Sequence, residues 1–151
     1  MMNWFECIVS YEKTMENGIQ KKVREKFLID SLSFTEAEAR ITEEIKPYIS
    51  GEFSIADIKR ARLSELFFND NGDRFFKAKV MFITFDEKSN SEKQTSTQML
   101  AQASNLREAL QIVNKGMEGT LADYFISSLS ETSIMDVFPY SEQDKKKIQL
   151  T

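Results

Sequence analysis

Histidine is absent from this 151-residue sequence, and cysteine occurs once, as Cys7. The absence of histidine removes the commonest general base and the commonest zinc ligand. A single cysteine cannot form an intrachain disulfide, so nothing supports an oxidising compartment. The five glycines form neither a G-x-x-x-x-G-K-[ST] nor a G-x-G-x-x-G phosphate loop. We therefore predict no catalytic residue and no cofactor.

Long apolar runs and a strong positive charge are also missing. No apolar run approaches the roughly 20 residues that span a bilayer. Residues 1–10 contain Glu6 and no basic residue, unlike a signal peptide. The net charge is −4, and neither half of the chain is basic. Nucleic-acid-binding proteins usually carry a strongly basic surface patch. We expect a cytoplasmic protein with no membrane partner, and no small-molecule ligand is evident.

The chain does contain enough apolar residues for a core. Hydrophobic residues make up 41% of the sequence, and twelve of its residues are phenylalanine. This length and composition predict one domain over residues 1–140. The polar segment 141–151 is expected to be a frayed tail.

The pattern of apolar residues and turn signals predicts strands and two helices. Asn17-Gly18 and the run from Asn69 to Gly72 are typical of tight turns. The first helix begins after Ser33, which forms an S-x-x-E capping box with Glu36. The expected order is strand 4–13, strand 20–29, a helix, a bent or bulged strand 53–67, strand 74–85, strand 93–102, a helix over 106–117 and strands 124–129 and 134–138.

The two parts of the chain resemble each other. Ser33-x-x-Glu36 returns as Asn105-x-x-Glu108, and other matches keep an offset of 71 or 72 residues. The alternative is that any two segments of this kind share hydrophobic spacing. The matched caps favour a duplication. We predict an α+β fold of two tandem ββαβ halves, about 3–68 and 74–138, in a largely antiparallel sheet with both helices on one face.

The chain also resembles a family of small proteins from gut bacteria and their phages, catalogued only as a domain of unknown function. The resemblance extends from Trp4 to Tyr140. It rests on four runs: Trp4 to Glu6 (WFE), Ser33 to Arg40 (SFTEAEAR), Ile49 to Phe53 (ISGEF) and Met135 to Tyr140 (MDVFPY). It implies a bacterial or mobile-element setting, and it brings no activity, cofactor or site residue with it.

Basic residues alternate along three expected strands and so share a face within each strand. If these strands are neighbours, the basic side chains form a patch for nucleic acid, with Trp4 or Phe75 available for stacking. The alternative is that they only solvate an open sheet face and guard its edges. The residues are Lys22, Arg24, Lys26, Arg60, Arg62, Lys77 and Lys79.

Some aromatic residues are candidates for exposure, because two short helices cannot cover all of them. Phe68, Phe75, Phe138 and Tyr140 are candidates for an interface, and an uncovered apolar patch favours a homodimer. Core burial is the alternative for each of them.

Carboxylates are numerous, but their spacing does not predict a metal site. Glu36, Glu43 and Glu44 lie along one expected helix, where such residues usually form a solvated face.

The sequence as a whole predicts a non-enzymatic binding or assembly module. A nucleic-acid-binding protein that uses a basic sheet face is the alternative, and a metal-dependent enzyme is a weaker one.

Overall fold

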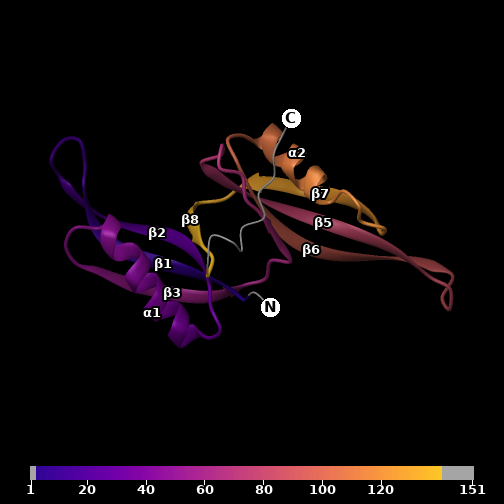
Figure 1. The fold of residues 1–151 in the computed structure, drawn as a ribbon, viewed down its shortest axis with the longest axis horizontal. Coiled ribbons are helices and arrows are strands. Elements are labelled where there is room, and N and C mark those ends of the chain that lie inside the picture. Colours follow the sequence, from indigo (N-terminus) through magenta and orange to yellow (C-terminus); the bar gives the residue numbers. More distant parts are fainter. Residues whose placement is uncertain (1–2, 141–151) are drawn as a thin grey trace. The chain divides into compact units, whose positions relative to one another are not determined.

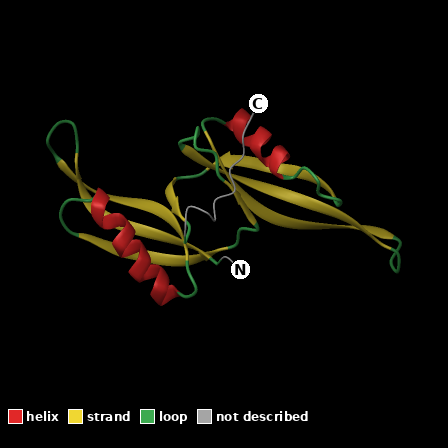
Figure 2. Cartoon of the chain, in the orientation of Figure 1, coloured by secondary structure: helices red, strands yellow, loops and turns green. Residues whose placement is uncertain are grey.

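The computed structural model describes residues 3–140, and the predicted tail 141–151 lies outside them. The chain divides into two compact units (Figure 1). Unit 1 runs to Ala61 and also includes the segment that begins at Ser133, whereas unit 2 is Arg62–Thr132. Each unit contains one sheet and one helix, so the mixed α+β class is confirmed (Figure 2).

Unit 1 contains a four-stranded sheet, which we call sheet A. Its strand order is β3-β1-β2-β8, in which β1 is antiparallel to both β2 and β3, and β8 is parallel to β2. The elements of this unit are β1 (Trp4–Thr14), β2 (Gln20–Asp30), α1 (Phe34–Ile45), the 3-10 helix η1 (Lys46–Tyr48), β3 (Phe53–Ala61) and β8 (Ile134–Phe138).

Unit 2 repeats this arrangement in sheet B, whose strand order is β4-β6-β5-β7. Strand β5 is antiparallel to β6 and β7, and β4 is parallel to β6. The elements of this unit are β4 (Glu65–Phe67), β5 (Arg74–Asp86), β6 (Ser91–Ala103), α2 (Leu106–Gly116) and β7 (Asp123–Glu131).

The prediction of one sheet with both helices on one face is wrong. The structure has two four-stranded sheets, and each carries its own helix. The expected strand 53–67 is in fact two strands. Strand β3 ends at Ala61, and the chain then enters the other sheet as β4. The expected irregularity is present in its first part, where the register of β3 against β1 shifts between Ile8 and Val9.

The turn from Asn69 to Gly72 forms, but it does not join neighbouring strands. The amide of Gly72 donates to the carbonyl of Asn69 at 3.0 Å, yet β6 lies between β4 and β5 in the sheet. A Cβ atom at Gly72 would lie 2.4 Å from the Cα atom of Ala103. Glycine is therefore required here by the close approach of two backbones.

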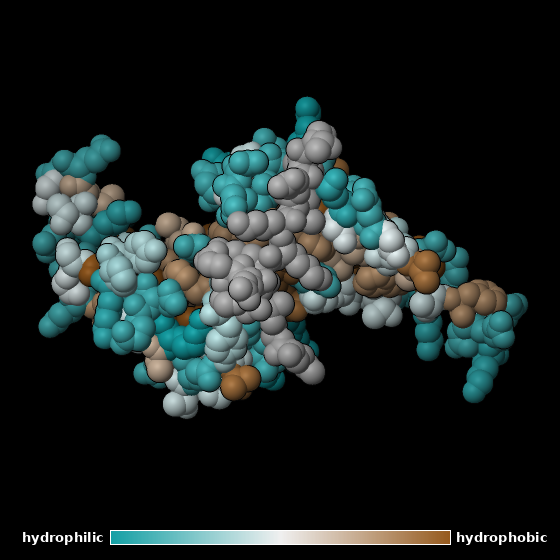
Figure 3. Space-filling model, viewed as in Figure 1, coloured by the Kyte–Doolittle hydropathy of each residue, from teal (hydrophilic) through white to brown (hydrophobic). Residues whose placement is uncertain are grey.

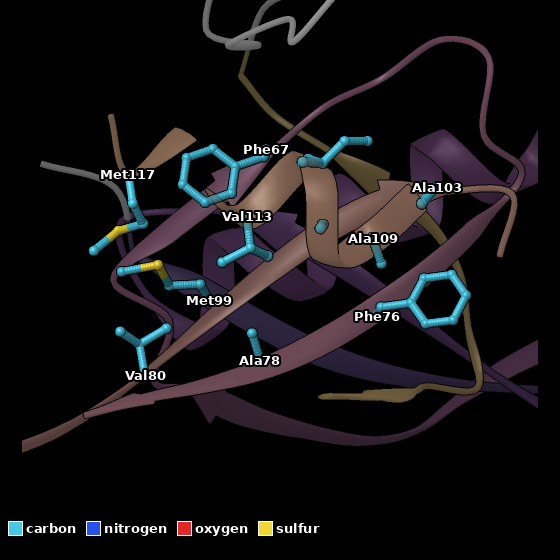
Figure 4. Close-up of a cluster of buried hydrophobic side chains, with 11 residues drawn as sticks. Phe67, Phe76, Ala78, Val80, Met99, Ala103, Ala109, Val113 and Met117 are labelled. Atoms are coloured by element: carbon cyan, nitrogen blue, oxygen red, sulfur yellow. The ribbon is translucent and has the colours of Figure 1, made fainter. Parts of the chain in front are cut away.

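Each helix packs on one face of its own sheet. In unit 2, the buried residues of α2 contact side chains from β4, β5 and β6 (Figure 4). In unit 1, Ala37, Ile41 and Ile45 of α1 pack on β1 and β2 in the same way. The unit 2 cluster consists of Phe67, Phe76, Ala78, Val80, Met99, Ala101, Ala103, Ala109, Ile112, Val113 and Met117.

Both predicted N-caps, Ser33 and Asn105, are confirmed, and the glutamate three residues after each cap also holds a strand. Ser33 accepts from the amide of Glu36 at 3.1 Å, and Asn105 accepts from that of Glu108 at 2.8 Å. The Glu36 carboxylate accepts a hydrogen bond from the Tyr140 hydroxyl, just after β8. The Glu108 carboxylate accepts one from the side-chain amide of Asn69 at 3.0 Å, just after β4. The capping glutamate of each helix thus fixes the end of the short strand in the same unit.

We expect Asn69 and Glu108 to be energetically coupled. Glu108→Ala removes the acceptor for Asn69 and for the Ser104 amide, 2.9 Å away, and should lower the free energy of unfolding by about 1–2 kcal/mol. A double-mutant cycle with Asn69→Ala, measured by urea unfolding, should give a coupling of roughly 0.5–1.5 kcal/mol. The control is Glu118→Ala, because Glu118 is an exposed glutamate of the same unit. Additive effects of the two substitutions would contradict this coupling.

Candidate functional site

The face of sheet B opposite α2, which we call the helix-free face, carries three of the candidate residues, Phe75, Lys77 and Lys79. Phe76, Ala78 and Val80 of β5 point into the α2 cluster, so the alternating residues of this strand point the other way. Exposure increases along this face, from 4% at Phe75 to 60% at Phe85. The helix-free face is therefore accessible over the part of the strand that lies away from Phe75.

Two of the predicted basic residues, Lys77 and Lys79, lie on this face in the central strand β5. Lys77 is opposite Leu100 and Ser130, and Lys79 is opposite Gln98 and Ser128. None of these four cross-strand partners carries a charge. Within residues 3–140, neither lysine forms an ion pair. In the part of the chain that the structure describes, no carboxylate therefore pairs with either positive charge.

Arg62 lies beside this pair, in the segment between β3 and β4. It lines a groove of about 580 Å³ together with Leu63, Ser64, Ser96, Thr97 and Gln98. The amide of Ser64 donates to the carbonyl of Gln98 at 2.8 Å, which fixes this segment against β6. Gln98 is also the cross-strand partner of Lys79, and Lys77 is two residues from Lys79 on the same face. We treat Arg62, Lys77 and Lys79 as one group of cations on this basis.

The remaining basic residues do not join this group. Lys22, Arg24 and Lys26 share the face of sheet A opposite α1, in unit 1. Lys26 forms an ion pair with Glu6 at 3.3 Å, and Lys22 lies opposite Glu12. The seven predicted residues thus divide between the units.

Arg60 lies on the other face of sheet A. It is the cross-strand partner of Phe5, and its guanidinium carbon lies 5.8 Å from the centre of the Phe5 ring. Phe5 belongs to the cluster that packs against α1. Arg60 therefore does not share a face with Lys22, Arg24 and Lys26.

The aromatic residues expected at the surface are mostly buried. Phe68 and Phe75 are each 4% exposed, so their expected exposure is not observed, and Trp4 is equally inaccessible for stacking at 3%. Phe138 stacks on Phe27 with ring centres 6.0 Å apart. Tyr140 is half exposed, with the Arg40 guanidinium 4.4 Å from its ring centre.

A different aromatic residue occupies the helix-free face. Phe125 of β7 is 40% exposed and lies opposite Met81 of β5. Sequence reasoning missed Phe125, although a usable signal was present. Tyr124 and Ile126 are the residues of β7 that pack toward α2, and strand alternation places Phe125 on the opposite face.

No group in the described part of the chain has the arrangement of a catalytic or metal centre. Over residues 3–140, no three His, Cys, Asp or Glu side chains are placed to hold a metal ion. Cys7 is buried, and this burial, together with the nearby Glu6 charge, raises its pKa to about 12. A thiol in this state is a poor nucleophile. Glu36 is used in capping, and Glu43 pairs with Lys46 at 2.7 Å.

Comparison with protein families gives one match, over residues 3–140, to the model described as Domain of unknown function (DUF4494). The chain belongs to this family. The match covers both units of the DUF4494 protein and confirms the resemblance to a family of unknown function. No curated protein matches the chain. Within residues 3–140 of this DUF4494 protein, no helix is long and apolar enough to cross a bilayer.

Tyr11 provides a test of the electrostatics of unit 1. Its hydroxyl donates to the Glu25 carboxylate at 2.6 Å, and this hydrogen bond is the main reason that its pKa is raised to about 12 from the usual 10. Only the protonated phenol donates, so the stabilisation is complete below pH 10 and is lost as the pH rises through 12.

We expect Tyr11→Phe to lower the melting temperature at pH 8, by the equivalent of at most about 1 kcal/mol because the pair is partly exposed. The difference from the wild type should shrink between pH 10 and 12. Both proteins keep Cys7, so its titration cancels in the comparison. A difference that stays constant up to pH 12 would show that the hydrogen bond does not contribute.

Proposed function

We propose that this DUF4494 protein is a non-enzymatic nucleic-acid-binding module, with the helix-free face of sheet B as its contact surface. The observation that carries the proposal is the group of Arg62, Lys77 and Lys79 around Gln98, which has no carboxylate opposite either lysine. Uncharged polar residues lie next to these cations, among them Gln98, Ser128 and Ser130. Such groups hydrogen-bond to phosphate oxygens and base edges without opposing a negatively charged ligand.

The net charge of −4 does not conflict with this proposal. At physiological ionic strength, charges more than about 8 Å apart are largely screened at the surface. A phosphate on sheet B therefore experiences mainly the nearby cations. Three phosphate contacts should give a slope of log K against log salt of roughly −2 to −3. Such a slope indicates modest affinity that depends strongly on salt.

The basic residues of unit 1 should contribute less to nucleic-acid binding than those of sheet B. Lys26 is paired with Glu6 and Lys22 faces Glu12, so Arg24, opposite Ser10, is the least neutralised of the three. We expect unit 1 to add little to the affinity for nucleic acid.

Assembly is the second candidate function, and the edge of β6 supports it. Strand β4 pairs only with Met99–Ala101, so the outer edge of β6 from Ser91 to Thr97 has no strand partner within residues 3–140. An unpaired edge is a template for pairing with another strand. A homodimer formed through this edge would appear in light scattering, and a strict monomer at high concentration would remove this candidate.

We also propose a duplication as the origin of the chain. The order of elements is the same in β1 to β4 as in β5 to β8, and both capping glutamates hold the end of a short strand. The family resemblance supports a bacterial or phage setting for the protein.

We expect Lys77→Gln/Lys79→Gln to weaken binding of a labelled 15-nucleotide DNA by on the order of tenfold or more at 100 mM salt, because two phosphate contacts are lost. The salt slope should fall by about 1 for each lysine. Fluorescence anisotropy over a salt series measures both quantities.

The matched control for this variant is Lys13→Gln/Lys21→Gln. These two exposed lysines lie opposite each other on β1 and β2, and their loss changes the net charge equally. An equal loss of affinity in both variants would show that only net charge matters, and no salt-sensitive binding by the wild type would overturn the proposal.

A further inference from the structure

An apolar patch adjoins the three cations on the helix-free face, and electrostatic binding alone does not require it. Met81, Ile83 and Phe85 alternate along β5, and Phe125 is on β7. Phe85 is 60% exposed and Phe125 is 40% exposed. Hydrophobic surface is visible along the β5–β6 hairpin of unit 2 (Figure 3). Contiguous exposed apolar surface often marks a site that contacts a ligand or partner.

The strand register places this patch directly beside the cations. One row across the sheet is Gln98, Lys79 and Ser128, and the next row is Ser96, Met81 and Phe125. Phe125 lies opposite Met81, which is two residues from Lys79 on the same face of β5, and β7 has one extra residue between the two rows because the register shifts there. A single ligand of nucleotide size can therefore contact both rows.

The chemistry of the two rows differs in a way that indicates the form of the ligand. The first row, extended by Arg62 at the groove, offers positive charge and hydrogen-bond donors. The second row offers the ring of Phe125 and the thioether of Met81, which are suited to stacking and apolar contact. The bases of a duplex are already stacked on each other, whereas those of a single strand are free to stack on a protein side chain.

On the basis of the proposed function, we infer that the DUF4494 protein binds single-stranded nucleic acid in preference to duplex. The phosphates contact Arg62, Lys77 and Lys79 near Gln98, and a base stacks on Phe125 beside Met81. The strand crosses the β-strands rather than following them, because the charged and the apolar rows both run across the sheet. Stacking accepts every base, so the preference is for strandedness and not for sequence.

The test compares Phe125→Ala, Phe125→Leu and Phe125→Trp. The leucine variant keeps apolar bulk but has no ring, so it separates stacking from folding if the alanine variant is unstable. The tryptophan variant restores a ring and should show fluorescence quenching when a base stacks on it. Leu121→Ala is the control, because Leu121 is also an exposed apolar residue of unit 2.

Three probes are used: a labelled 15-nucleotide oligo-dT, a 15-base-pair duplex and inorganic polyphosphate as an anion without bases. Phe125→Ala and Phe125→Leu should each weaken oligo-dT binding on the order of tenfold. They should leave the duplex and polyphosphate affinities and the salt slope unchanged, and Phe125→Trp should bind oligo-dT at least as tightly as the wild type.

The possible failures differ in what they overturn. Full oligo-dT affinity in Phe125→Leu, together with loss of binding in Lys77→Gln/Lys79→Gln, would overturn stacking and leave the proposed function in place. Equal wild-type affinity for oligo-dT and duplex would do the same. Failure of the wild type to bind any of the three probes would overturn both. Self-association that Phe125→Ala abolishes, without nucleic-acid binding, would assign the patch to a protein partner instead.

Discussion

The sheet of each unit is completed by a short strand that arrives from the other part of the chain, and the fold depends on holding that strand in place. Strand β4 follows β3 of unit 1 but pairs with β6 of unit 2, and β8 follows β7 of unit 2 but pairs with β2 of unit 1. Both are short, with three and five residues, so backbone pairing alone fixes them weakly. The contacts from the capping glutamates to Asn69 and Tyr140 secure their ends. Unit 2 contains all four strands of sheet B in one continuous segment, whereas sheet A needs β8 from the segment that begins at Ser133.

The passage of the chain from β3 in sheet A to β4 in sheet B also positions the proposed binding surface. The segment that carries the chain from β3 to β4 contains Arg62, and the bonds from Ser64 to Gln98 hold it beside β6. Because β4 covers only three residues of β6, the outer edge of β6 from Ser91 to Thr97 has no strand partner within residues 3–140. Lys79 and Phe125 then meet on the helix-free face through the register of β5 with its two neighbours.

Local patterns in the sequence predicted the elements well and their assembly poorly. The helix starts at Ser33 and Asn105 were predictable because capping depends on residues three positions apart. The separation of β3 from β4 was not predictable, because apolar residues continue on both sides of Arg62 and nothing in the pattern marks a change of sheet. The same limit applies to the site. Alternation correctly grouped Lys77 with Lys79, but the positions of Arg60 and Arg62 depend on where β3 ends. Phe125 could be recognised as part of a surface patch only through its cross-strand neighbour Met81, about 44 residues away in the sequence. Such a pairing depends on the strand register, which the local pattern does not reveal.

The most direct test of this account is a titration of the isotope-labelled protein with oligo-dT, followed by amide chemical shifts in NMR spectra. The account predicts shift changes that concentrate on Lys77 to Met81, on Ser96 to Gln98 and around Phe125, with smaller changes on β2. Changes confined to β2 around Arg24, or spread evenly over both units, would contradict the assignment of the binding surface to sheet B.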